Sequence, residues 1–172
     1  MRLLITGGAG FIGSNTVYSL LSKEEVERLV VIDCLTYAGN LSNLKNITDN
    51  KKYIFKKLDI RDENNILDLI NHESIDHVIH LAAESHVDRS ITNPGKFLET
   101  NVIGTYSLIN ACFRSWKYKK NCKFLHVSTD EVYGSLGKTG LFTENDKYKP
   151  SSPYSASKAA SDHLVYSYIK TF

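Results

Sequence analysis

The segment TGGAGFIG, residues Thr6 to Gly13, decides the fold of this 172-residue chain. It directly follows an apolar, β-branched run, Leu3–Thr6, and leads into a helical pattern, Ile12–Ser22. Glycines at such a junction allow a tight turn, close approach of the main chain to a pyrophosphate, and close packing of helix on strand. The first turn of the helix adds free N–H groups and the positive end of its dipole. The pattern therefore predicts a strand, a dinucleotide-binding loop and a helix.

Short β-branched runs and longer helical patterns alternate along the rest of the chain. We expect further strands at residues 29–33, 53–58, 77–82 and 123–128, and helices at 63–71, 94–116 and from about 153 to the end. This alternation implies right-handed crossovers and a mainly parallel sheet. The predicted fold class is α/β, a Rossmann-type doubly wound sheet, with residues 1–172 forming one NAD(P)-binding domain. Asp62 is expected to cap the helix at 63–71, and Asn93 with Pro94 to start the next one.

Composition excludes several classes of protein. Apolar residues make up 42% and charged residues 23%, as in a folded soluble domain, and the net charge is only +2. No apolar run is long enough for a bilayer, and the N-terminus has no room for a secretory segment. Cys34, Cys112 and Cys122 are scattered and form no CxxC pair, so we expect reduced thiols in the cytoplasm and no metal site. We expect neither a nucleic-acid nor a membrane partner.

Two acidic residues favour NAD as the dinucleotide. Asp33 ends the second expected strand, about 20 residues after the last glycine, where a carboxylate accepts the ribose hydroxyls of NAD and repels a 2′-phosphate. Asp59, followed by Ile60 at the end of the third expected strand, suits the amino group of adenine. Helix capping shared with Asp62 is the alternative for Asp59.

Two further motifs suggest acid–base chemistry. Tyr154 and Lys158 stand one helical turn apart, and a lysine ammonium together with a positive nicotinamide favours the phenolate and lowers the tyrosine pKa. Asp130 and Glu131 are adjacent at the end of the fifth expected strand. Such a pair supplies one acid and one base, as an elimination of water needs. Each string alone also fits a solvated helix or turn.

Four segments then extend the glycine motif: DCLTYAGNL from Asp33, LAAESHVDRS from Leu81, STDEVYG from Ser128, and PSSPYSASK from Pro150. Tyr154 and Lys158 resemble the acid–base pair of the short-chain dehydrogenase/reductase superfamily, and TGGAGFIG is similar to its extended branch. Together the segments resemble the dTDP-glucose 4,6-dehydratases over residues 6 to 158. Cys34 departs from the usual lysine, which a main-chain contact to adenosine should tolerate.

The resemblance implies a set of site residues. The catalytic residues would be Thr129, Asp130, Glu131, Tyr154 and Lys158, and Ser85 and Thr129 would touch the sugar. The NAD site would be lined by Gly7, Gly10, Phe11, Ile12, Gly13, Asp33, Cys34, Leu35, Thr36, Asp59, Ile60, Leu81, Ala82, Ala83, Glu84, Ser85, Thr100, Tyr154 and Lys158. His86 and Asp88 could suggest a metal, but hydrogen bonds in a turn explain them better.

The resemblance also implies a reaction. Tyr154 would take the proton of the sugar 4-OH, held by Thr129, while hydride passes from C4 to NAD. Glu131 would remove the C5 proton, Asp130 would protonate the departing 6-OH, and the hydride would return to C6. The expected product is dTDP-4-keto-6-deoxyglucose, and the expected partners are dTDP-glucose and a second copy of the chain, as the family commonly dimerises.

The sequence ends at Phe172 in or just after a helix, with no strand to follow. We therefore expect a chain cut short, with the C-terminal nucleotide-sugar-binding part absent and no measurable turnover on its own. The alternatives are a UDP-glucose 4,6-dehydratase and a truncated, non-catalytic NAD-binding chain. The base of the substrate nucleotide is not readable, because its contacts in the family lie beyond Phe172.

Overall fold

The computed structural model describes residues 1–172, and these form two compact units. The sheet unit comprises Met1–Ala82 and Ser107–Val127, and the helix unit comprises Ala83–Tyr106 and Ser128–Phe172. Both units are built from two separate stretches of the chain, so each is described by itself.

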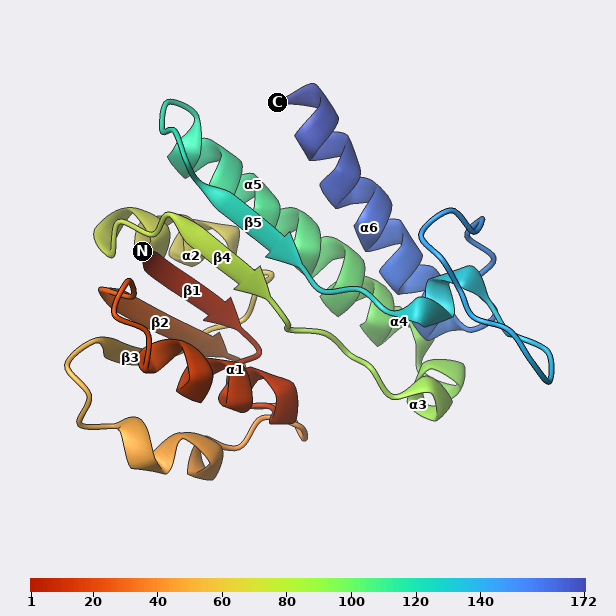
Figure 1. Ribbon diagram of the computed structural model, residues 1–172, viewed down its shortest axis with the longest axis horizontal. Coiled ribbons are helices and arrows are strands. Elements are labelled where there is room, and N and C mark those ends of the chain that lie inside the picture. The colour runs from red at the N-terminus through yellow and green to blue at the C-terminus, as the bar shows by residue number, and fades with distance from the viewer. The chain divides into compact units, whose positions relative to one another are not determined.

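The sheet unit contains five parallel strands in the order β3-β2-β1-β4-β5 (Figure 1). They are β1 (Arg2–Thr6), β2 (Arg28–Asp33), β3 (Tyr53–Lys57), β4 (His77–His80) and β5 (Lys123–His126). In the central register Ile5 lies opposite Val31 of β2 and Ile79 of β4. The strand order reverses beside β1, which places the glycine loop at the switch point where parallel α/β sheets bind ligands.

Two hydrophobic cores cover the two faces of this sheet. On one face Leu3 and Ile5 pack with Val17 of helix α1 (Phe11–Leu21) and Leu44 of the 3₁₀ helix η1 (Leu41–Ile47). On the other face Leu4 packs with Ile66 of α2 (Glu63–His72) and with the part of α5 (Thr105–Trp116) that belongs to this unit. Burial on both faces explains the near-continuous apolar strands and confirms the predicted doubly wound sheet.

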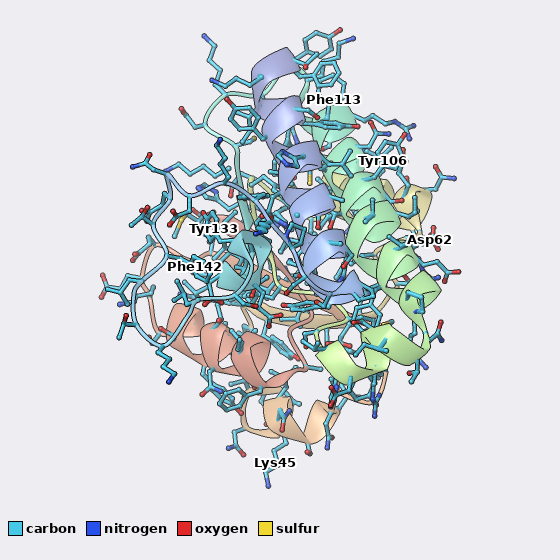
Figure 2. The ribbon with its side chains drawn as sticks, turned by 90° about the vertical axis from the view of Figure 1, so that its right-hand side faces the viewer. Lys45, Asp62, Tyr106, Phe113, Tyr133 and Phe142 are labelled. Atoms are coloured by element: carbon cyan, nitrogen blue, oxygen red, sulfur yellow. The ribbon has the colours of Figure 1, made fainter.

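The strand ends differ slightly from the sequence-based prediction. β4 stops at His80 instead of Ala82, and β5 stops at His126 instead of Ser128. The main-chain N–H groups of Leu81 and Ala82 donate to the side-chain hydroxyl of Thr6, the last residue of β1, instead of continuing the main-chain ladder. The predicted cap of α2 is confirmed, because the Asp62 carboxylate accepts from Asn65 N at 3.3 Å; Figure 2 labels Asp62.

The helix unit contains α3 (Val87–Thr92), α4 (Pro94–Phe97), a π-helical segment η2 (Leu98–Gly104), a 3₁₀ turn η3 (Asp130–Tyr133) and α6 (Pro153–Thr171). The helix predicted for 94–116 is confirmed in its bounds, since α4, η2 and α5 follow one another without a break, but η2 has π instead of α geometry. The hydroxyl of Thr105 donates to Asn101 O at 2.6 Å within this stretch, a side-chain bond that competes with the regular ladder. Asn93 and Pro94 start α4 as predicted, with Asn93 at the N-cap position, although the Asn93 side chain makes no capping bond.

The three cysteines are free thiols, exposed at Cys34, buried at Cys112 and half-buried at Cys122. None of the helices combines the length and the apolar character needed to cross a membrane.

Candidate functional site

The glycine loop packs main chain directly against main chain. Gly7 has a φ of +69°, and a Cβ atom there would lie 2.8 Å from the N and Cα atoms of Ala82. A Cβ on Gly13 would lie 2.2 Å from Gly7 O. Helix α1 begins after Gly10 with no side-chain cap and no acidic residue in its first turn. Its first turn therefore has no side-chain acceptor, which is the arrangement that binds anions at helix starts.

Asp33 is held at the end of β2 by main-chain donors. Its Oδ2 atom accepts from Ala9 N at 3.0 Å and its Oδ1 atom from Leu35 N at 2.8 Å. The second bond holds Leu35 at a φ of +58°, an uncommon conformation for a residue with a side chain. Gly39 closes over the carboxylate, since a Cβ there would lie 2.5 Å from Oδ1. The carboxylate thus lies beside the glycine loop, 8% exposed and fixed in orientation.

Asp59 forms an ion pair instead of a helix cap. Its carboxylate accepts from Arg61 Nη2 at 2.8 Å and from Arg61 N at 2.9 Å, and these bonds lower the Asp59 pKa. The capping alternative is therefore wrong, because Asp62 alone caps α2. Ile60 is buried in the core at 5% exposure. Cys34 is exposed, and partial burial with the charges of Asp59 and Asp33 raises the pKa of its thiol.

Thr6 connects the glycine loop to the segment after β4, a role that the sequence did not suggest. Its Oγ1 atom accepts from Leu81 N at 3.2 Å and from Ala82 N at 3.1 Å. The same atom lies 2.7 Å from His80 Nδ1. Because both lone pairs are taken, Thr6 donates its one proton to Nδ1, and His80 holds its own proton on Nε2. The predicted NAD-site residues Leu81 and Ala82 are positioned by this bond.

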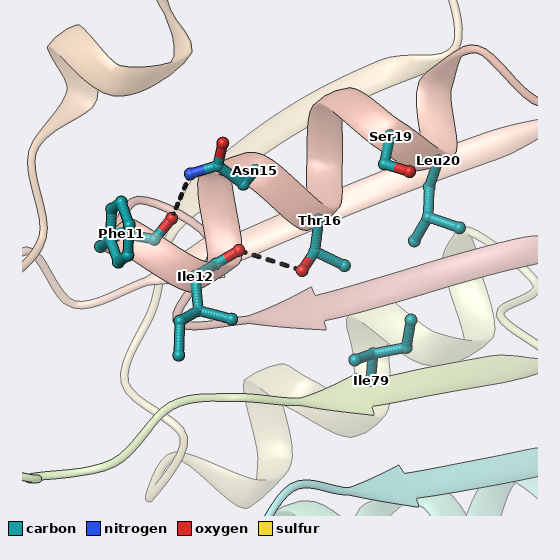
Figure 3. A pocket seen from close by; sticks show the side chains of 7 residues that line it. All are labelled: Phe11, Ile12, Asn15, Thr16, Ser19, Leu20 and Ile79. Atoms are coloured by element: carbon teal, nitrogen blue, oxygen red, sulfur yellow. Dashed lines mark hydrogen bonds between the residues drawn. The ribbon is translucent and has the colours of Figure 1, made fainter.

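An open cavity of about 480 Å³ lies beside α1, on the side of the helix toward Ile79 of β4 (Figure 3). It is lined by Phe11, Ile12, Asn15, Thr16, Ser19, Leu20 and Ile79. The polar side chains of Asn15 and Thr16 donate hydrogen bonds to main-chain carbonyls of their own helix, Asn15 to Phe11 O at 2.8 Å and Thr16 to Ile12 O at 3.0 Å. Phe11 is 83% exposed, so the predicted NAD-site residues Phe11 and Ile12 offer apolar surface beside the first turn of α1.

The predicted NAD-site residue Thr36 lies in the loop after β2, where its carbonyl accepts from Gly39 N at 3.1 Å. The other predicted NAD-site residues not yet described belong to the helix unit. Ala83, Glu84 and Ser85 follow Ala82, and Thr100 lies in η2. The buried Glu84 carboxylate pairs with Lys96 Nζ at 2.9 Å. Asn101, which the sequence analysis did not single out, exchanges hydrogen bonds with Glu84 N at 2.8 Å and Glu84 O at 2.9 Å, and its amide also donates to Ser157 Oγ at 2.8 Å. It thereby fastens the Glu84 segment to α6. No spacing rule marks such a residue.

Four of the five predicted catalytic residues interact within the helix unit. Burial raises the pKa of Tyr154, a hydrogen bond with Thr129 lowers it, and the charges of Glu131 and Asp130 raise it. These carboxylates lie in η3, where Thr129 Oγ1 accepts from Glu131 N at 3.4 Å. The predicted lowering of the Tyr154 pKa is thus not produced by the protein residues alone. The part of the lowering of the Tyr154 pKa that the sequence analysis attributed to a positive nicotinamide stays a prediction.

Lys158 lies one turn after Tyr154 and is only 5% exposed. Burial lowers its pKa to about 8, against the opposing charge of Asp162. A buried lysine with so low a pKa is uncommon outside functional sites.

A capping box fixes the start of α6 and therefore the position of Tyr154 in its first turn. Ser152 Oγ accepts from Ser155 N at 3.0 Å, and Ser155 Oγ accepts from Ser152 N at 3.0 Å. Pro153 occupies the first helical position, where it needs no partner for a main-chain N–H. The PSSPYSASK segment thus encodes a firm helix start two residues before the tyrosine.

His86 and Asp88 lie at the start of α3, and the chain contains no group of three or more His, Cys, Asp or Glu side chains arranged to hold a metal ion.

Comparison with known families and curated proteins gives a consistent result. The model of the family described as GDP-mannose 4,6 dehydratase matches residues 4–172. A dTDP-glucose 4,6-dehydratase of Xanthomonas campestris is 52% identical over 98% of this chain and 49% of its own length. One from Escherichia coli is 48% identical over the whole chain and 51% of its own length. The chain spans about half the length of the curated relatives it matches.

Solved structures agree with this result. The dTDP-glucose 4,6-dehydratase DesIV of Streptomyces venezuelae, solved with NAD and TYD bound, has a TM-score of 0.92 and 43% identity over 99% of this chain and 52% of its own. The UDP-glucose 4-epimerase of Thermus thermophilus, solved with NAD, has a TM-score of 0.87 at 32% identity, over the whole chain and 52% of its own.

Proposed function

The chain belongs to the GDP-mannose 4,6-dehydratase family, and on that premise we propose that it is the NAD-binding half of a dTDP-glucose 4,6-dehydratase. The observation that carries this proposal is the gathering of Thr129, Asp130, Glu131 and Tyr154 on η3 and α6. An adjacent pair of carboxylates beside the tyrosine favours a dehydratase over an epimerase, whose chemistry needs no elimination of water.

The residues present fit NAD. The uncapped start of α1 suits the pyrophosphate, and the loop before it has no side chain at Gly7, Gly8 or Gly10 to block its approach. The fixed carboxylate of Asp33 suits the two adenosine ribose hydroxyls and repels a 2′-phosphate. Arg61, the first arginine after Asp33 in the sequence, is already paired with Asp59, which further favours NAD over NADP.

NAD, when bound, would supply a hydride acceptor that later returns the hydride to the same sugar. In the proposed reaction Tyr154 takes the proton of the 4-OH while Thr129 holds that hydroxyl. Lys158 binds the nicotinamide ribose and favours the phenolate of Tyr154. Glu131 then removes the proton from C5, and Asp130 gives a proton to the departing 6-OH. With the hydride returned to C6 and a proton returned to C5, the product is the 4-keto-6-deoxy sugar nucleotide, formed by a hydro-lyase reaction.

Three further assignments belong to this proposal: residues 1–172 act as one NAD(P)-binding domain, the enzyme works in the cytoplasm, and it forms a homodimer. Exposed apolar side chains on α6, among them Tyr166 and Ile169, support the last of these. Light scattering coupled to size exclusion tests it, and a monomer at all concentrations would contradict it.

The cofactor assignment is tested by calorimetric titration of the 172-residue chain with NAD. We expect Asp33→Ala to weaken binding by about 1–3 kcal/mol, the cost of losing hydrogen bonds to a charged acceptor. Asp49→Ala, which removes an exposed carboxylate from the loop before β3, is the matched control and should bind normally. Equal affinities for Asp33→Ala and the unmutated chain would remove Asp33 from the site.

The reaction is tested in a chimera of residues 1–172 with the C-terminal half of the Escherichia coli relative, supplied in parallel with dTDP-glucose and UDP-glucose. We expect turnover of dTDP-glucose, and none from the 172 residues alone, since the sugar nucleotide then lacks most of its binding energy. In the chimera Glu131→Gln should leave the first oxidation intact and accumulate NADH without 4-keto product. Turnover at the native rate by Glu131→Gln would disprove the assignment of the base.

A further inference from the structure

Asp162, on α6 one helical turn beyond Lys158, has no part in the reaction described above. Its Oδ2 atom accepts two hydrogen bonds, from Ser128 Oγ at 2.5 Å and from Tyr148 Oη at 2.9 Å. Both donors come from outside the helix, 34 and 14 residues away in the sequence. One carboxylate oxygen therefore joins three segments of the helix unit.

The two donors lie on either side of the turn that carries the carboxylate pair. Ser128 immediately precedes Thr129, Asp130 and Glu131. On the other side, Lys149, the neighbour of Tyr148, donates its N–H to Val132 O at 2.9 Å. A Cβ on Gly134, whose φ is +104°, would lie 2.7 Å from Lys149 O, so the main-chain segments around these two residues are in close contact.

Aromatic contacts strengthen the second side. The Tyr148 ring meets the Tyr133 ring edge-on at 5.3 Å between centroids, and it lies 5.2 Å from the His163 ring of α6. Tyr133 in turn packs on Phe142 at 5.6 Å; Figure 2 labels both rings. The segment before α6 is thus packed on η3 and attached to α6 through the same tyrosine.

The charges in this cluster agree with its hydrogen bonds. Burial and the bond to Asp162 raise the pKa of Tyr148 to about 12, so the phenol stays a donor at neutral pH. Asp162 raises the pKa of Lys158 against the effect of burial, and it also raises the pKa of Tyr154. The ionisable groups around Asp162 are therefore Lys158, Tyr154, Tyr148 and His163. The charges of Asp130 and Glu131 also raise the pKa of Tyr154.

We propose that Asp162 is a positioning residue that holds the Asp130–Glu131 turn against helix α6 and places a carboxylate one helical turn from Lys158. The inference rests on the proposed function, because Asp162 would position Glu131, Tyr154 and Lys158 for the roles proposed there. The clasp made by Asp162, Ser128 and Tyr148 sets the elimination pair in a fixed position relative to the tyrosine and lysine. Misplacement of reacting groups by about 1 Å can cost on the order of 100-fold in rate.

The test uses the 172-residue chain with ¹³C-labelled lysine side chains and follows the Lys158 resonance, identified by its loss in Lys158→Arg, against pH. We expect Asp162→Asn to lower the Lys158 pKa by about one unit, since a nearby opposite charge is lost. Asp162→Glu should restore it. Asp68→Asn, the same change at an exposed position of α2, is the control and should leave Lys158 unmoved.

Ser128→Ala and Tyr148→Phe separate the clasp from the charge, because each removes one donor and keeps the carboxylate. We expect amide exchange at Gly134 and Lys149 to rise about tenfold in both variants, without a fall in the Lys158 pKa. Equal Lys158 pKa values in Asp162→Asn and Asp68→Asn would overturn the charge assignment. Unchanged exchange in both donor variants would overturn the clasp, even if Asp162→Asn failed to fold. Neither readout needs NAD or sugar, so failure here is distinct from failure of the NAD titration.

Discussion

In the glycine loop the candidate binding surface consists of main-chain atoms, whereas in the Tyr154 cluster it consists of side chains. The loop works because side chains are missing, so that Gly7 meets Ala82 and Gly13 meets Gly7 without room for a Cβ. The cluster depends on hydroxyl and carboxylate groups that are hydrogen-bonded around η3 and α6, and on the charge of Lys158 one helical turn from Asp162. The first arrangement tolerates almost no added atom, while the second depends on charge and on hydrogen-bond partners. The two regions should therefore fail in different ways.

The largest effect is expected where an added methyl group meets main chain. Gly13→Ala would place a Cβ 2.2 Å from Gly7 O and 2.7 Å from Gly8 Cα, so the loop must move. We expect the free energy of unfolding to fall by about 3 kcal/mol or more. Gly95→Ala is the matched control, because its Cβ has nothing within 4 Å, and helix propensity should raise stability by up to about 1 kcal/mol. Urea denaturation measures both, and equal stabilities would break the contrast between the two regions.

The next effect concerns charge in the Tyr154 cluster. The pKa of Lys158, about 8 in the folded chain, lies below its ordinary 10.5, so at pH 7 the folded state holds a buried ammonium at a cost. Lys158→Met should raise the free energy of unfolding at pH 7 by on the order of 2–3 kcal/mol. Between pH 8 and 10.5 the unfolded chain binds more protons than the folded one, so the unmutated chain gains stability and the difference closes.

Urea denaturation of both chains at pH 7, 9 and 10.5 checks this prediction, since the other ionisable groups cancel in the difference. A Lys158→Met chain that is less stable than the unmutated chain at pH 7 would show that favourable contacts of the ammonium outweigh its burial.

The smallest effect is expected at the helix start. Ser152→Ala removes one half of the capping box of α6 and should lower the free energy of unfolding by about 1 kcal/mol. Because the first turn carries Tyr154, amide exchange should rise at Ser155 and Ala156 more than at the far end of α6. Ser167→Ala, an exposed position near that end, is the control. A uniform increase along the helix would show that the cap does not act locally.

The same contrast explains how much the sequence could predict. Parallel strands, the glycine loop between β1 and α1, the position of Asp33 at the end of β2 and the capping of α2 by Asp62 follow from residue types at fixed local spacings, and the structure confirms these positions. The early end of β4 could not be foreseen, since it depends on Thr6 meeting residues 75 and 76 positions away. Asn101 and Asp162 were missed for the same reason, because side-chain bonds across 56 and 34 residues leave no mark in local sequence. The π-helical η2 likewise depends on such contacts.

The division of the chain into interleaved units bears on its synthesis. The chain leaves the sheet unit after Ala82, returns at Ser107, and leaves it again after Val127. A nascent chain that has emerged through β4 therefore lacks β5 and the part of α5 that covers β1. Until those segments emerge, the apolar side chains of Leu4 and Val78 stay exposed to non-native contacts. The helix unit is completed later still, because its second stretch, Ser128–Phe172, emerges only after β5. Vectorial folding is thus discouraged, and chaperone binding to the partly emerged sheet is the expected consequence.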